Sequence, residues 1–169
     1  MGIAVLGVLA YFSGDIADAS RLGYAVHAWL GLVSGLFLLG RLALGFIGPK
    51  RALFRNWFPV TKARLASVFE DLRGLLAFKL PKRDARKGLA GALQAFGLLV
   101  FIWMTASGLL LYLMTMPGER SSGVVHTIEE AHEAGVGLFI FFLILHVGGA
   151  FLHLMAGRNY LKRMFFLER

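Results

Sequence analysis

Apolar residues gather into three long runs, roughly Leu22 to Ile47, Leu89 to Met116 and Ala134 to Ala156. Each run is longer than the roughly 20 residues that an α-helix needs to cross a hydrocarbon core of about 30 Å. A fourth run, Met1 to Ser13, covers only about 20 Å as a helix. The pattern predicts an all-α integral membrane protein, a four-helix transmembrane bundle whose first helix is short. The predicted helices cover residues 1–14, 22–47, 89–116 and 129–157.

Composition supports a single membrane domain of 169 residues. Apolar residues make up 57% of the chain and charged residues 17%, whereas a soluble domain has about 25% charge. The chain has no cysteine, which excludes disulfides, thiolate ligands, iron–sulfur clusters and covalently attached c-type haem. Any metal must therefore be held by nitrogen, oxygen or methionine sulfur.

The charges are divided unequally between the connections. The segment 48–88 carries eleven Lys/Arg against three acidic residues, and the tail after Gly157 adds four more Lys/Arg. The connections 15–20 and 117–133 are acidic. The positive-inside rule then places both termini and the basic segment of a multi-pass membrane protein in the cytoplasm. The net charge of +8 is thereby explained without nucleic acid.

Within the basic segment, residues 61–79 have the apolar spacing of a helix. We expect this helix to lie on the inner leaflet of the membrane, because its apolar residues share one side. An ordinary loop helix is the alternative.

Five histidines are the candidate functional residues: His27, His126, His132, His146 and His153. Ionisable side chains are costly within a bilayer, so each is a functional hypothesis; a neutral histidine bonded to a neighbouring helix is the alternative. The spacing of fourteen and then seven residues keeps His132, His146 and His153 within about 60° on one helical face. His27 and His132 both lie near the outer membrane edge, where they can meet.

A pair of imidazoles from facing helices is what six-coordinate b-type haem needs, whereas zinc needs three or four ligands at one depth. Arg41, buried in the second helix at about the depth of His146, needs an anion such as a haem propionate. Its alternative is to snorkel to the inner surface. Small residues lie at helical offsets from the histidines, where they leave room for a macrocycle but equally serve helix packing. They include Gly31, Gly35, Gly135, Gly149 and Ala150, with Gly97 and Gly108 on the third helix.

Two segments resemble a known family: LGYAVHAWLGLVSGLFLLGRLALGFIGP in the second helix and HEAGVGLFIFFLILHVGGAFLHLMAGRNYLKRM in the fourth. They are similar to the bacterial cytochrome b561 group, which includes the cytochrome subunits of nickel–iron hydrogenases and formate dehydrogenase. The resemblance implies a location in the bacterial inner membrane and two b haems, with His27 and His132 binding the outer one and His146 the inner one. The family's second inner ligand comes from a His-Trp pair at the start of the first helix.

That inner ligand is absent here, so the chain shows one fully ligated haem site. Family members place this ligand about fourteen residues, or about 20 Å of helix, before the Ser-Gly pair that ends the first helix. In this chain the pair begins at Ser13, so the ligand would lie at or just before Met1. We therefore expect the natural protein to begin upstream. If it begins here, the inner haem is five-coordinate, takes a substitute ligand or is lost.

Two histidines stay outside this ligand set. His153, about 10 Å further inward than His146, is expected to line a quinone pocket or meet a propionate, with helix packing as an equal alternative. His126 lies in the acidic outer connection, where we expect it to face solvent or a partner.

The predicted function is that of a dihaem membrane cytochrome b that transfers electrons between a periplasmic redox subunit, such as a hydrogenase or dehydrogenase, and membrane quinone. A self-contained quinone-linked oxidoreductase is the close variant. A second hypothesis is a haem-free four-helix anchor or assembly subunit of a redox complex. A third, a small transporter, lacks an inverted repeat. Lipid is an expected partner, and a homodimer is left open.

Overall fold

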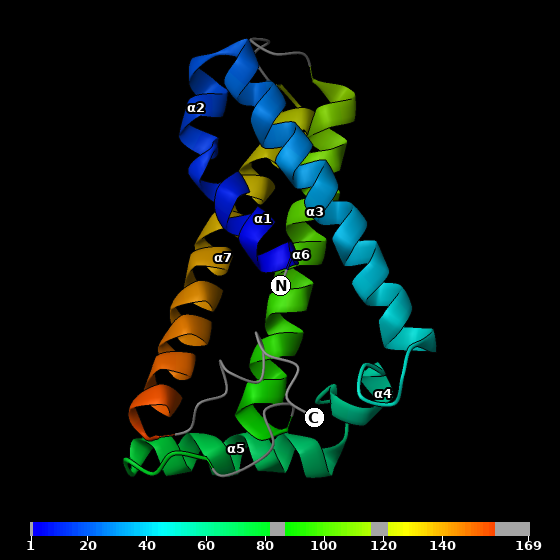
Figure 1. Ribbon diagram of the computed structural model, residues 1–169. Helices are drawn as coiled ribbons and strands as arrows, with labels where there is room; N and C mark the ends of the chain where they lie inside the picture. Colours follow the sequence, from blue (N-terminus) through cyan, green and yellow to red (C-terminus); the bar gives the residue numbers. More distant parts are fainter. Residues whose placement is uncertain (1, 82–86, 116–121, 158–169) are drawn as a thin grey trace. The chain divides into compact units, whose positions relative to one another are not determined.

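The computed structural model describes residues 2–81, 87–115 and 122–157, and within these ranges every regular element is a helix (Figure 1). The expected all-α class is therefore confirmed for the described part of the chain. The helices are α1 (Gly2–Phe12), α2 (Gly14–Ala19), α3 (Arg21–Ile47), α4 (Phe54–Trp57), α5 (Lys62–Leu76), α6 (Gly88–Met114) and α7 (Val124–Met155).

Three of these helices, α3, α6 and α7, are long and apolar enough to cross a membrane. The shorter first helix is α1, whose 11 residues span only about 16 Å. The charged segments that predict the orientation are described only in part. The ranges outside the described residues are 82–86, 116–121 and 158–169.

The described residues form two compact parts, one within residues 1–56 and 98–138 and the other within residues 57–97 and 139–169. One segment of α6 and one of α7 belong to each part. The first part also contains α1, α2 and α3, the second contains α5, and the short α4 lies at the division between them.

In the first part, the predicted loop at 15–20 is mostly helical, because α2 follows α1 with Ser13 between them. The segment GDIADA of α2 has no apolar periodicity, so this helix could not be predicted from the pattern. Ser20 then turns the chain: its backbone is extended and its side chain accepts a hydrogen bond from the Gly23 N–H at 3.0 Å. This is an N-cap for α3.

Close helix contacts hold this first part together. A Cβ on Gly23 would overlap the Ile16 carbonyl of α2, so α2 and α3 approach each other through main chain. A Cβ on Gly35 would lie 2.9 Å from the Thr105 methyl of α6. The Trp103 indole of α6 donates to the Ala131 carbonyl of α7 at 2.8 Å. Within this part, α6 and α7 are therefore hydrogen-bonded to each other, and Gly35 of α3 lies against Thr105 of α6.

In the second part, α5 begins at its Thr61 N-cap, close to the predicted start at residue 61. Figure 1 shows α5 lying across the N-terminal end of α6. Asp71 connects the two helices: it is buried, and its carboxylate accepts a hydrogen bond from the Leu89 N–H in the first turn of α6 at 2.9 Å. A negative charge at a helix N-terminus is favourable because it meets unpaired N–H groups and the positive end of the helix dipole.

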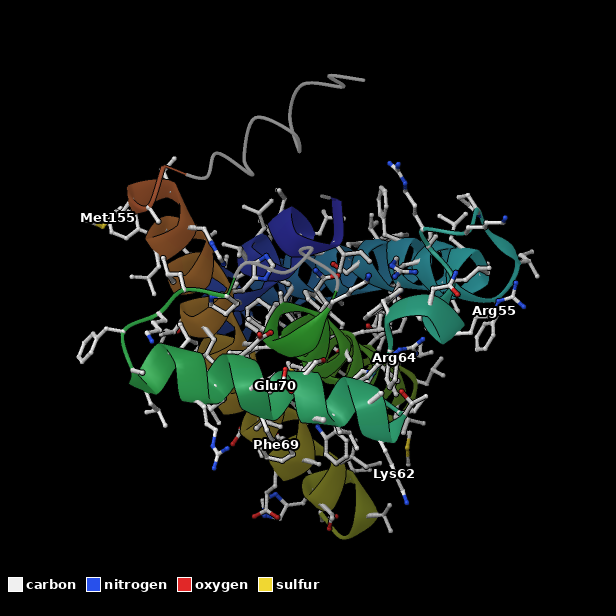
Figure 2. The ribbon with its side chains drawn as sticks, turned by 90° about the horizontal axis from the view of Figure 1, so that it is seen from below. Arg55, Lys62, Arg64, Phe69, Glu70 and Met155 are labelled. Atoms are coloured by element: carbon white, nitrogen blue, oxygen red, sulfur yellow. The ribbon has the colours of Figure 1, made fainter. Side chains whose placement is uncertain are left out.

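The opposite side of α5 carries a row of apolar side chains that we call the α5 stripe: Leu65, Phe69, Leu72 and Leu76. All four are exposed, and Phe69 is 65% exposed. Figure 2 shows Phe69 projecting from the side of α5. Their spacing confines them to about 60° of the helix surface.

Candidate functional site

Two histidines meet in the first part of the chain. His27 lies on α3, close after the N-cap, and His132 lies on α7. Their ring centroids are 6.3 Å apart and their planes are nearly perpendicular, at 85°. The site therefore consists of two neighbouring imidazoles, one from α3 and one from α7.

The orientation of His27 is set by α1 and the residue that follows it. The His27 Nδ1 lies 3.0 Å from the Ala10 carbonyl oxygen and 3.2 Å from the Ser13 Oγ. The Ser13 hydroxyl donates to the same Ala10 carbonyl at 2.7 Å, so its oxygen is left to accept. Because a carbonyl can only accept, His27 Nδ1 carries the hydrogen and Nε2 keeps its lone pair.

The orientation of His132 is set by α6 in the same way. Its Nδ1 lies 2.9 Å from the Ser107 Oγ, and the Ser107 hydroxyl donates to the Trp103 carbonyl at 2.8 Å. With its hydrogen engaged in that bond, the serine oxygen is an acceptor for His132 Nδ1–H, and this tautomer again leaves a lone pair on Nε2. Ser13 and Ser107 are 5% and 8% exposed, so water does not compete for these bonds.

This donor set fits haem iron. The His27 and His132 imidazoles would hold the iron through their Nε2 atoms, and their centroid separation of 6.3 Å is compatible with two metal–nitrogen bonds of about 2 Å. A histidine that ligates a metal normally donates its other N–H to a nearby acceptor, as both rings do here. No group of three or more potential metal-ligating His, Asp or Glu side chains occurs among the described residues.

Glycines around the pair allow close approach. A Cβ on Gly108 would lie 3.1 Å from the His132 Cε1, so glycine lets this ring pack directly on α6. Gly31, one turn after His27, has open space where a Cβ would project. By contrast, Gly135 packs on the Trp103 and Met104 side chains. Helix packing is thus observed at Gly135, whereas room for a macrocycle beside the histidines stays a prediction.

Arg41 lies near the end of α3 and points to the chain that follows it. Its guanidinium donates to the Ala52 carbonyl at 3.4 Å and lies 5.1 Å from the centre of the Phe54 ring. A Cβ on Gly45 would overlap that same ring. Main-chain and aromatic contacts therefore hold the Arg41 side chain beside the 50–54 segment.

His146 and His153 lie on α7 in the second part of the chain. The half-buried His146 ring stacks on Phe142, with centroids 5.2 Å apart and planes inclined by 28°. Phe142 in turn packs on Gly97 of α6, where a Cβ would overlap the ring. His153 is half-buried near the end of α7. The ligand roles expected for these histidines remain predictions.

His126 belongs to α7 rather than to a loop, which corrects the predicted start of this helix near residue 129. The helix begins at Val124, so the polar residues before the apolar run are helical as well. His126 lies 3.7 Å from Glu129 and 3.5 Å from Glu130, and its side chain is 57% exposed. Its position on an acidic, exposed helix end separates it from the paired histidines.

Three groups at the site were not predicted from the sequence: the Ala10 carbonyl, Ser13 and Ser107. An isolated serine within an apolar helix was an available signal, because its hydroxyl needs a partner there. Which partner it takes depends on how close the neighbouring helix lies, and the sequence does not contain that information.

Comparison with known proteins gives one match. A family model described as prokaryotic cytochrome b561 matches residues 1–167. No match was found among curated proteins or among solved structures. The family match covers both histidines of the pair and almost the whole chain.

Proposed function

The chain belongs to the prokaryotic cytochrome b561 family, whose members are membrane b-type cytochromes of electron transfer, and we propose that it carries electrons between a periplasmic redox partner and membrane quinone. The observation that supports this proposal most directly is the His27–His132 pair, with ring centroids 6.3 Å apart and Nδ1 of each ring hydrogen-bonded.

In this proposal His27 and His132 would hold an outer haem, which would supply one-electron transfer. The Ala10 carbonyl, Ser13 and Ser107 orient the two rings. In a bilayer, the long apolar helices would keep water away from the haem.

The remaining parts of the proposal concern the inner half of the membrane. We propose that His146 ligates a second haem, that Arg41 meets a propionate, and that His153 lines a quinone site. The acidic start of α7, with Glu129 and Glu130 exposed beside His126, is the surface we propose for a periplasmic redox subunit.

The test is the haem content of the purified 169-residue chain, measured as pyridine haemochrome together with a reduced-minus-oxidised spectrum. We expect at least one low-spin b haem per polypeptide, because the His27–His132 pair is complete within the chain. A folded preparation that was supplied with haem and binds none would contradict the proposal, and the haem-free membrane anchor would then be the better account.

We further propose that α5 lies in the membrane interface with the α5 stripe in lipid. Asp71 fixes α5 to the end of α6, a helix able to cross the membrane. Helical spacing places Lys62 and Arg73 beside the stripe, where they suit anionic headgroups.

This orientation predicts opposite environments for two neighbouring residues. Because the chain has no cysteine, Phe69→Cys and Glu70→Cys each give a single thiol for a spin label. In vesicles containing phosphatidylglycerol, we expect the label at 69 to collide mainly with oxygen and the label at 70 mainly with an aqueous nickel complex, as measured by power-saturation EPR. Equal access of the nickel complex to both labels would contradict an interfacial α5.

A further inference from the structure

Each histidine of the pair has a buried serine at its Nδ1, but the two arrangements differ. His27 Nδ1 has two acceptors, the Ser13 hydroxyl and the Ala10 carbonyl, and the carbonyl is main chain that no side-chain substitution removes. His132 Nδ1 bonds to the Ser107 hydroxyl. The orientation of His132 therefore depends strongly on the Ser107 side chain. The orientation of His27 depends less on Ser13, because the Ala10 carbonyl also accepts from it.

Ser107 is well placed to orient His132 because its hydroxyl hydrogen is already used in a bond to a main-chain carbonyl. The hydroxyl donates to the Trp103 carbonyl one turn earlier at 2.8 Å, with the Met104 carbonyl further away at 3.4 Å. The oxygen lone pair is thereby presented to His132. The next residue, Gly108, lies against the Cε1 of the same ring, so two consecutive residues of α6 bound one edge of the imidazole.

We propose that Ser107 is a positioning residue for His132, whose hydroxyl fixes the plane and tautomer of the imidazole and thereby lowers the reduction potential of the haem that this ring ligates. The inference rests on the proposed function. Its physical basis is that an acceptor at Nδ1–H makes the ring a stronger electron donor through Nε2, which favours ferric over ferrous iron.

The test is a potentiometric titration of the haem spectrum in the full chain, with variants at both serines. At a fixed ambient potential, we expect Ser107→Ala to raise the ferrous-to-ferric ratio severalfold and up to about tenfold, which corresponds to about 59 mV for a one-electron couple. Ser107→Thr keeps a hydroxyl and should retain the wild-type ratio. Ser13→Ala should shift the ratio less than Ser107→Ala, because the Ala10 carbonyl still accepts from His27.

A second readout is the low-spin ferric EPR spectrum, whose largest g-value depends on the angle between the two ring planes. We expect this signal to move or broaden in Ser107→Ala and to stay unchanged in Ser107→Thr. The matched control is Ser67→Ala on α5, which removes a similar hydroxyl-to-carbonyl bond, Ser67 to Arg64 at 2.7 Å, without a histidine. This control should change neither readout.

The proposal is overturned if Ser107→Ala binds haem with the wild-type potential and EPR signal. If Ser107→Ala binds no haem, the comparison moves to Ser107→Thr and Ser107→Val, which have the same shape and differ in the hydroxyl. Haem retained with threonine and lost with valine supports the proposal, and equal behaviour of the two overturns it. A wild-type chain without haem is a different result, because it contradicts the proposed function itself.

Discussion

Replacing either His27 or His132 with alanine is expected to remove the outer haem. Each substitution deletes one of two imidazoles whose centroids lie 6.3 Å apart, and no described third His, Asp or Glu side chain joins them to form a metal-ligating group. We expect the low-spin haem bound at this site to fall about tenfold or more in each variant, since loss of a supporting partner alone typically costs 10- to 100-fold in metal affinity. Pyridine haemochrome and the reduced-minus-oxidised spectrum measure the loss.

The matched control for this experiment is His126→Ala. His126 lies on the same helix as His132, but it is exposed and pairs with glutamates. Its haem content should equal that of the wild type. If His126→Ala lost as much haem as His132→Ala, the pair would not be the ligand set.

The second large effect is expected at Gly23, where α2 and α3 touch through main chain. A Cβ there would overlap the Ile16 carbonyl, and a backbone group cannot move aside as a flexible side chain can. We expect Gly23→Ala to lower the free energy of unfolding by about 3 kcal/mol, the upper end for overpacked sites. Because Gly23 lies one turn before His27, haem content should fall as well. Equilibrium unfolding in mixed detergent micelles measures the stability.

Gly40→Ala, also on α3, provides the comparison. Nothing lies within 4 Å of the position that its Cβ would occupy. Alanine in an open helical position is more favourable than glycine by about 0.5–1 kcal/mol, so this variant should be as stable as the wild type or slightly more stable. Similar losses at both positions would mean that the α2–α3 contact is not the cause.

Much of the fold could be predicted from hydropathy because the apolar runs are long. Runs of more than twenty apolar residues predict α3, α6 and α7, whose type is fixed by the need to satisfy every backbone hydrogen bond in lipid. The six residues of α2 were missed because so short a polar segment has no periodicity. The start of α7 was placed too late because its glutamates were attributed to a loop.

The candidate site was accessible only in part. Histidines are conspicuous in an apolar helix, so His27 and His132 could be singled out from residue type and spacing. The groups that orient them could not, because Ser13 and Ser107 gain their roles from the approach of separate helices. The same holds for Gly108, whose contact with the His132 ring depends on the distance between α6 and α7.

The bonds from Ala10 and Ser13 to His27 also affect the order of biogenesis. The contacts among α1, α2 and α3 join residues close in sequence, and such local contacts form early and fast. At about 5–20 residues per second, His132 leaves the ribosome several seconds after His27. His27 can therefore be oriented while the chain is still being made, whereas the site is completed only when the last long helix arrives. Haem would then bind at this pair only after the last long helix has been inserted into the membrane.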